Sequence, residues 1–225
     1  MKHLLFFILI IAAVIPLTAQ EPVPAGESPE AEKPAAEESV LSDQVYREII
    51  LEDFETNNYD NTMIAIKVTK DQKVELQIRD QYPAPVKGSK KYIGVKVYGK
   101  QGDNATITLP KPLIIKDYCQ SISMWVYGKK FSGELSLVVT DADEKVHKLS
   151  YDKLNFLGWR KLTVRLTKDI IQEDKYLSQA KFLKITKIIY NPGSTERLGQ
   201  WNYFYIDDIS AKVREKYKDL QNDEW

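Results

Sequence analysis

Two groups of acidic residues lie near opposite ends of this 225-residue sequence, both at expected strands. Glu52, Asp53 and Glu55 follow one apolar run, and Asp207 and Asp208 lie within another. The first and last strands of many jelly rolls are neighbours, so these carboxylates could meet and bind a structural Ca²⁺. Strict alternation would point one of each adjacent pair inward, where it needs a partner. The alternative is that the acids pair with lysines, cap turns or accept backbone hydrogen bonds.

Residue types suited to catalysis are scarce. His147 is the only histidine beyond residue 19, and it lies in a strand-like run without a strained glycine turn around any serine. Cys119, the single cysteine, begins an apolar run and is expected to be a small core residue. The sequence has no Gly-rich phosphate loop, HExxH motif, CxxC pair or EF-hand loop. We therefore expect no enzyme activity and no cofactor other than the candidate Ca²⁺.

Aromatic residues are the second feature with binding chemistry. The chain has 4 Trp, 13 Tyr and 7 Phe, and such rings stack on sugars or anchor protein interfaces. Trp125 and Trp159 lie in regularly alternating runs and are expected in the core. The segment WNYFY, which contains Trp201, Tyr203 and Tyr205, has aromatics at positions of both parities. Part of this ribbon must therefore be exposed or covered by a partner.

Short alternating or β-branched runs separated by turn residues fill the chain after residue 46. They predict strands at 48–54, 62–69, 74–79, 92–98, 105–109, 121–127, 134–140, 146–151, 159–166, 182–190 and 202–213. Eleven strands at this spacing indicate one all-β domain, an antiparallel β-sandwich or jelly roll resembling carbohydrate-binding modules. A helix or helical turn is expected only within 168–179 and in a charged tail from 213 to 221.

The N-terminal region predicts export. Residues 1–19 have a lysine, an apolar run too short to span a bilayer, and a small residue at the end, as a signal peptide does. Residues 20–43 follow as a proline-rich linker, with seven acids against Lys33 alone between 21 and 43, which predicts a disordered arm. The sandwich should span 44–213 and the tail 214–225. No membrane insertion is expected after signal cleavage, and the periplasm is the expected location.

The overall charge excludes one class of partner. The 32 Lys and Arg residues balance 32 Asp and Glu residues, so the formal net charge is zero. A chain without a net positive field is poorly suited to hold a polyphosphate backbone, so no nucleic acid is expected as a partner.

The ordered set of motifs resembles a known family. LEDFE (51–55), SMWVYGKKFSGELSLVVTD (123–141), LGWRKLTVRLTKDIIQ (157–172), FLKITKIIYNPG (182–193) and FYIDDISAKV (204–213) follow a signal peptide, as in the spirochaete flagellar filament outer-layer (sheath) proteins. The resemblance covers most of 48–213 and implies a short-type, non-enzymatic subunit of the periplasmic flagellum. It also implies flagellin core subunits and other sheath proteins as partners, and a contribution to filament stiffness, curvature and motility.

Two hypotheses about surfaces follow. In the first, the sandwich packs along the filament through Trp201, Tyr203 and Tyr205 together with basic loops that contain Lys90, Lys91, Lys129 and Lys130. In the second, from a different functional class, the chain is a periplasmic carbohydrate-binding module that recognises a glycan through exposed aromatics, Trp201 among them.

Overall fold

The computed structural model describes residues 45–67, 71–174, 180–195 and 199–216. All eleven predicted strands are confirmed, with shifts at their ends. They are β1 (Arg47–Glu52), β2 (Ile64–Lys67), β3 (Lys73–Arg79), β4 (Tyr92–Gly99), β5 (Asn104–Ile115), β6 (Tyr118–Lys129), β7 (Glu134–Thr140), β8 (Val146–Lys153), β9 (Leu157–Arg165), β10 (Leu183–Asn191) and β11 (Gln200–Arg214). One short 3₁₀ turn, η1 (Asn61–Met63), precedes β2.

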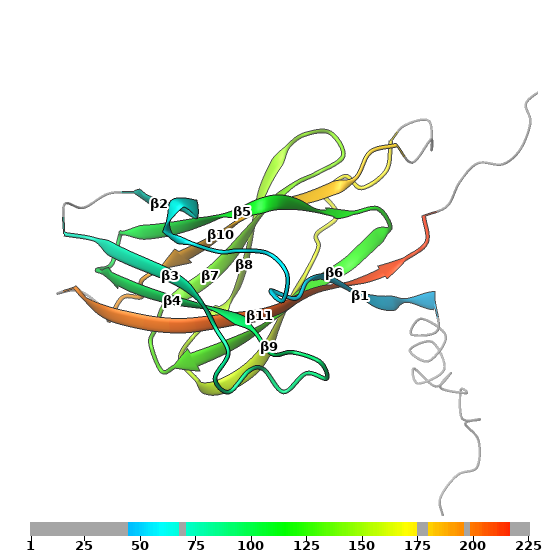
Figure 1. Ribbon diagram of the computed structural model, residues 1–225. Coiled ribbons are helices and arrows are strands. Elements are labelled where there is room, and N and C mark those ends of the chain that lie inside the picture. Colours follow the sequence, from blue (N-terminus) through cyan, green and yellow to red (C-terminus); the bar gives the residue numbers. More distant parts are fainter. Residues whose placement is uncertain (1–44, 68–70, 175–179, 196–198, 217–225) are drawn as a thin grey trace, which may run out of the picture. The chain divides into compact units, whose positions relative to one another are not determined.

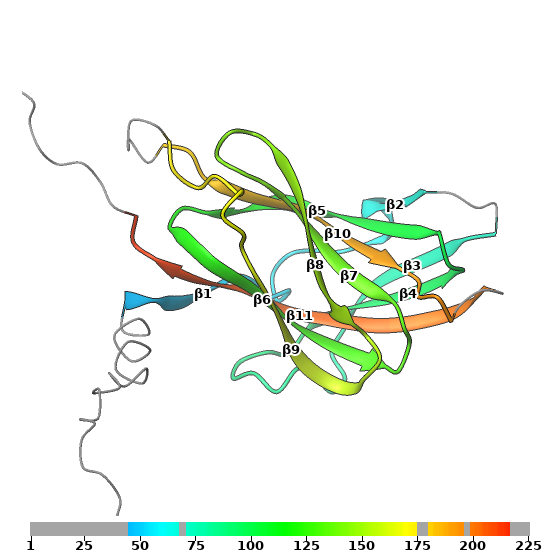
Figure 2. The same cartoon turned by 180° about the vertical axis from the view of Figure 1, so that it is seen from behind.

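The strands form two antiparallel sheets, which Figures 1 and 2 show as separate layers. Sheet A has the order β3-β4-β11-β6-β9, and sheet B has the order β2-β5-β10-β7-β8. Strand β11 is long enough to take two partners along one edge: β4 pairs with its first half, and β1 pairs with its second half. The first and last strands are therefore neighbours, as expected for this class of fold.

The core lies between the sheets and follows from period-two alternation. In β4, Ile93, Val95 and Val97 are at most 1% exposed, whereas the residues between them face away from sheet B. Strand β6 repeats the pattern with Ile122, Met124 and Val126. Burial of these branched and unbranched apolar side chains, each contributing about 1.5–3 kcal/mol, is the main stabilising term.

A β-bulge in β11 changes which residues face the core. Asp207 is opposite Trp125 and Ser210 is opposite Ser123, so two residues of β11 stand against one of β6 between these pairs. Asp208 has a positive φ of 38°, which is typical of a bulge. Before the bulge the even-numbered residues face the core, and after it the odd-numbered ones do, as the buried Phe204 and Ile209 illustrate. Asp207 and Asp208 both lie on the outer side of sheet A.

Three expectations about local structure need correction. The argument that one of two adjacent aspartates must point toward the core is wrong here, because the bulge interrupts alternation. No helix forms over 168–174, which has turns and bends, and 175–179 lie outside the described residues. Val213 and Arg214 belong to β11 rather than to a helical tail, and 217–225 are not described. The expected signal peptide and acidic linker, residues 1–43, also lie outside the described ranges.

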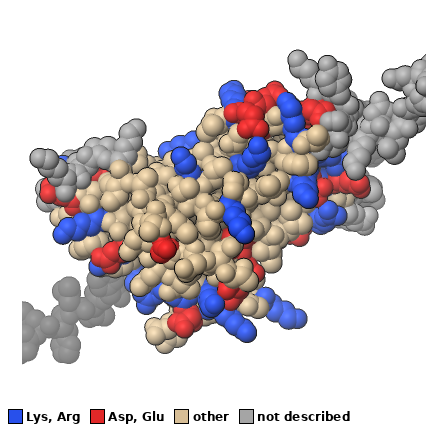
Figure 3. All heavy atoms as spheres, turned by 45° about the horizontal axis from the view of Figure 1, so that its top comes forward, with Lys and Arg blue, Asp and Glu red and all other residues tan. Residues whose placement is uncertain are grey.

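Two further observations describe the hydrophobicity of the helices and the distribution of surface charge. Within the described ranges, no helix has the length and hydrophobicity that a bilayer crossing requires. Figure 3 shows lysines and arginines interspersed with aspartates and glutamates on the face it presents, and neither sign forms a continuous field there.

Candidate functional site

The outer side of sheet A carries a concentration of aromatic side chains, which we call the aromatic face. Its members come from four adjacent strands, β4, β11, β6 and β9, at the positions that alternate with core residues. They are Tyr92, Tyr98, Trp125, Tyr127, Trp159, Trp201, Tyr203 and Tyr205. The sequence-based placement of Trp125 and Trp159 in the core is wrong, since both are half-buried on this outer face.

One transverse row of this face explains its shape. Strand register aligns Gln77, Gly94, Tyr205, Tyr127 and Trp159 across all five strands of the sheet A path. Gly94 leaves a gap in the row: a Cβ atom there would lie 2.6 Å from Cδ of Arg79 and 3.2 Å from Cδ1 of Tyr205. The missing side chain lets the arginine of β3 and the tyrosine of β11 approach each other over β4.

Four rings of the face form a closed cycle of contacts. Trp159 is in edge-to-face contact with Tyr92 and Tyr127, with 5.5 Å between ring centroids in each pair. Tyr205 completes the cycle, at 5.5 Å from Tyr92 and 5.6 Å from Tyr127. Edge-to-face pairs of this kind contribute about 0.5–1.5 kcal/mol beyond area burial. The rings therefore hold one another in place as a preformed wall.

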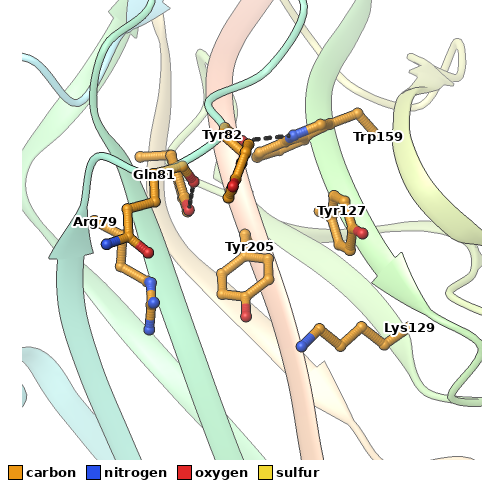
Figure 4. Close-up of a pocket in the computed structure, with 8 residues that line it drawn as sticks. Arg79, Gln81, Tyr82, Tyr127, Lys129, Trp159 and Tyr205 are labelled. Atoms are coloured by element: carbon orange, nitrogen blue, oxygen red, sulfur yellow. Dashed lines mark hydrogen bonds between the residues drawn. The ribbon is translucent and has the colours of Figure 1, made fainter.

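The cycle borders a cavity of about 230 Å³, which we call the aromatic pocket and which Figure 4 shows. Its lining residues are Arg79, Gln81, Tyr82, Tyr92, Tyr127, Lys129, Trp159 and Tyr205. The segment between β3 and β4, the 80–91 loop, supplies Gln81 and Tyr82 to its rim. Trp159 Nε1 donates to the backbone oxygen of Tyr82 at 3.1 Å, and the Tyr92 hydroxyl donates to the backbone oxygen of Gln81. Burial raises the pKa of Tyr92, which keeps this donor protonated.

Two cations flank the same ring of the pocket. The Arg79 guanidinium lies 5.7 Å from the centroid of Tyr205, and Lys129 Nζ lies 5.5 Å from it. Figure 4 shows them on opposite sides of Tyr205. In the described part of the chain, neither forms an ion pair with a carboxylate. The pocket thus combines apolar walls with two cationic donors.

Two of the predicted calcium ligands instead hold the 80–91 loop. Asp207 Oδ2 accepts from the Ser89 hydroxyl at 2.6 Å and from the Ala84 amide at 3.3 Å. Glu55 Oε1 accepts from the amides of Lys90 and Lys91 at 2.5 and 2.8 Å. Burial opposes ionisation of Glu55, but these two backbone hydrogen bonds bring its pKa below the ordinary value.

The other predicted ligands have separate environments. Glu52 is buried and accepts from the Phe54 amide at 2.8 Å and from Asn57 Nδ2 at 2.6 Å. Asp53 accepts from the Glu55 amide at 3.0 Å. Asp208 lies close enough to Asp207, Asp53 and Glu55 to feel their charges. Within the described ranges, no three His, Cys, Asp or Glu residues form a group that could hold a metal ion. Calcium binding stays a prediction, and hydrogen bonding gives most of these acids a structural role.

The predicted interface residues divide into two sets. Trp201, Tyr203 and Tyr205 follow one another along the exposed side of β11, with Lys96 Nζ 4.1 Å from the Trp201 centroid and Lys129 Nζ 5.4 Å from that of Tyr203. The other predicted lysines, Lys90, Lys91 and Lys130, are exposed in loops and do not line the aromatic pocket.

The remaining candidates for chemistry have structural contacts. His147 Nε2 lies 2.7 Å from Oδ2 of the buried Asp141, at the β7–β8 turn. Cys119 is 1% exposed, and burial raises its thiol pKa to about 12. A thiol with this pKa is a poor nucleophile at neutral pH.

Sequence reasoning missed most of the pocket. Trp125, Tyr127 and Trp159 were detectable by parity, because Met124, Val126 and Leu162 supply the core-facing positions of the same strands. No periodic signal marks Tyr82 or Gln81, since the fold of an irregular loop over a sheet depends on tertiary contacts.

The sequence model of the family described as flagellar filament outer layer protein matches residues 34–218. The chain belongs to this family. A curated relative, the "putative flagellar filament outer layer-like protein" of Brachyspira hyodysenteriae, is 28% identical over 108 residues, which are 48% of this chain and 50% of that protein. The chain spans about half the length of this relative.

Solved structures similar to this outer layer protein are distant in sequence. A family 11 carbohydrate-binding module of a Clostridium thermocellum cellulase is 12% identical and has a TM-score of 0.43, covering 76% of this chain and 97% of the module. A xylan-binding domain from Paenibacillus barcinonensis is 12% identical and has a TM-score of 0.38, covering 75% and 97% respectively. At this level of likeness, nothing about a ligand follows for this chain.

Proposed function

We propose that this chain is a non-enzymatic structural subunit of the periplasmic flagellar filament sheath, which coats the flagellin core and contributes to filament stiffness and curvature. The observation that carries the proposal is the aromatic face, combined with membership of the outer layer family. Tyr92 is buried, and the other seven aromatic side chains of this face are half-buried on adjacent strands. They differ in this way from the scattered exposed apolar residues normal for a soluble protein.

The exposed part of β11 has the properties of an interface anchor. Trp201 is held between Tyr98, at 5.4 Å between centroids, and Lys96. A ring positioned in this way loses little conformational freedom when a partner covers it, and Trp and Tyr are enriched among residues that dominate binding energy. We assign the contacts with core flagellin and neighbouring sheath proteins to this strip.

Stepwise stripping of isolated periplasmic flagella tests the proposal. Mild acid or detergent removes the outer layer, the chain is followed by mass spectrometry, and filament diameter is measured by electron microscopy. We expect the chain to leave as the diameter falls, while the core stays intact. A chain that never copurifies with filaments would contradict the coat function.

Loss of an anchor ring should weaken filament binding. We expect Trp201→Ala or Tyr203→Ala to lower affinity for stripped filaments by about tenfold or more, because truncation removes apolar contact from a rigid site. Cosedimentation with stripped filaments measures the effect. Val146→Ala is the matched control, because Val146 is 64% exposed on β8 of the other sheet. Equal losses for the control and the Trp201 variant would show that the strip is not the interface.

The lysine part of the interface hypothesis has its own test. Reversal to glutamate at Lys90, Lys91, Lys129 and Lys130 should reduce assembly onto stripped filaments, and most strongly at low ionic strength, because exposed charges act over about 10 Å at 0.1 M salt. Filaments that keep their full coat with this variant would remove the loops from the interface.

A further inference from the structure

We infer that the aromatic pocket binds one pyranose ring carrying a carboxylate, that is, an acidic sugar residue within a glycan. The inference does not depend on the coat function, because binding of a free sugar requires no filament. Two residues, Lys129 and Tyr205, belong both to the pocket and to the candidate filament interface. The inference rests on the cycle of rings, the two flanking cations and the loop that closes the rim.

The dimensions favour a single small ring. Drug-sized ligands occupy pockets of about 300–1,000 Å³, whereas this cavity has a volume of about 230 Å³. Tyr92, Tyr127, Trp159 and Tyr205 already fix one another edge to face, so the wall needs little rearrangement when a ligand binds. The apolar C–H face of a pyranose fits such a wall, and its hydroxyls can reach the polar tips of the tyrosines and Gln81.

The charged side chains that line the aromatic pocket favour an anionic ligand. Arg79 and Lys129 approach from β3 and β6, and the described lining includes no carboxylate side chain. A sugar carboxylate beside Tyr205 would accept a charge-assisted hydrogen bond from one of the two cations and be attracted by the other, whereas a neutral sugar would leave both without an anionic partner. Gly94 permits this arrangement, because a side chain at this position would displace Arg79.

Two carboxylates position the rim. Asp207 and Glu55 together accept four hydrogen bonds from the 80–91 loop, and Trp159 and Tyr92 donate two more to its backbone. Tyr82 has a positive φ of 58° and is 88% exposed. A large, solvent-facing ring in a loop held at so many points is placed for contact with a ligand.

The test compares two sugars that differ only at C6, which is a carboxylate in one and a neutral hydroxymethyl group in the other. Methyl β-D-glucuronide and methyl β-D-glucoside are titrated into the protein at neutral pH, and the indole N–H resonance of Trp159 is followed by NMR. A Trp159→Phe variant assigns this resonance. We expect Kd for the glucuronide in about the millimolar range, as for other ligands with few atoms, and about tenfold lower than Kd for the glucoside.

Matched variants separate the roles of the lining. Arg79→Gln or Lys129→Gln should lower the tenfold preference for the glucuronide, whereas Lys148→Gln, which changes an exposed lysine of β8 on the other sheet, should preserve it. Tyr82→Asn should weaken binding of both sugars without unfolding, since asparagine tolerates a positive φ. Equal Kd values for the two sugars in the unmodified protein, or no movement of the Trp159 resonance with either, would overturn the inference.

Two cellular sources could present such a sugar, and cosedimentation distinguishes them. Loss of binding to peptidoglycan sacculi in Lys129→Gln, but not in Lys148→Gln, would place the sugar in the cell wall. The same pattern on stripped filaments, abolished by periodate oxidation of filament sugars, would place it on a filament glycan. Unchanged binding of Lys129→Gln to both would overturn the role of the pocket. The coat function fails separately, if the unmodified chain does not copurify with filaments.

Discussion

Replacing Asp141 by alanine should destabilise the protein by about 3–4 kcal/mol, which is a fall in Tm of about 10 °C. The buried carboxylate accepts from the amides of Asp143 and Lys145, both at 2.9 Å, and from His147 at 2.7 Å. These contacts hold the β7–β8 turn, in which Glu144 has a positive φ of 63°. Removal of the carboxylate leaves several donors without their acceptor. Thermal and chemical denaturation at pH 7 measure the loss.

The pH dependence and a control sharpen this expectation. Burial opposes ionisation of Asp141, but hydrogen bonds from His147, Lys145 and Asp143 bring its pKa below 3.8. Its contribution is therefore complete above pH 3.8 and is lost as the pH falls through the lower folded-state pKa, so the two proteins should converge in acid. Asp143→Ala removes only an exposed ion pair and should cost under about 1 kcal/mol. A loss that small for Asp141→Ala would refute the role of the carboxylate.

Asp208→Asn should have the opposite effect and stabilise the protein at pH 7.5 by about 2 kcal/mol. Burial, together with the charges of Asp207, Asp53 and Glu55, raises the pKa of Asp208 from 3.8 to about 6. Between these values the unfolded chain ionises first, so stability falls as the pH rises toward 6. Asparagine removes the charge and accepts the positive φ at the bulge. Tm measured from pH 4 to 8 checks the prediction.

The gain should fall to a small fraction near pH 4, where the carboxyl group is protonated in the folded state and only about half ionised in the unfolded state. A variant equally stabilised at pH 4 and pH 7.5 would show that the effect does not come from the charge. The same experiment tests the predicted calcium site. If the acids bind Ca²⁺, added CaCl₂ should raise the Tm of the unmodified protein, and Asp208→Asn should then be the less stable of the two.

Sequence periodicity is sufficient to predict the strands, because hydrophobic alternation and turn residues are local signals of where each strand begins and ends. In β4, the branched residues Ile93, Val95 and Val97 occupy every second position. This alternation marks the side of the strand that faces the core. Even the pairing of β1 with β11 was predictable from the fold class. The family, too, follows from the ordered motifs, and the match over residues 34–218 confirms it.

The site depended on contacts that no local pattern encodes. The bulge at Asp208 moves both aspartates to the outer face, and its position is set by how two distant strands meet. Trp159 was expected in the core, although in the folded sheet it lies beside Tyr127 and beneath the 80–91 loop.

The sequence alone therefore determined the strands, the all-β class and the family, because hydrophobic alternation and motif order are properties of neighbouring residues. Only the tertiary structure determined the aromatic pocket and the role of its supporting acids. Arg79, Lys129 and Trp159 come from three strands, and strand register, a missing side chain at Gly94 and one anchored loop bring them together. These are long-range packing relations, and they depend on the geometry of the complete sheet.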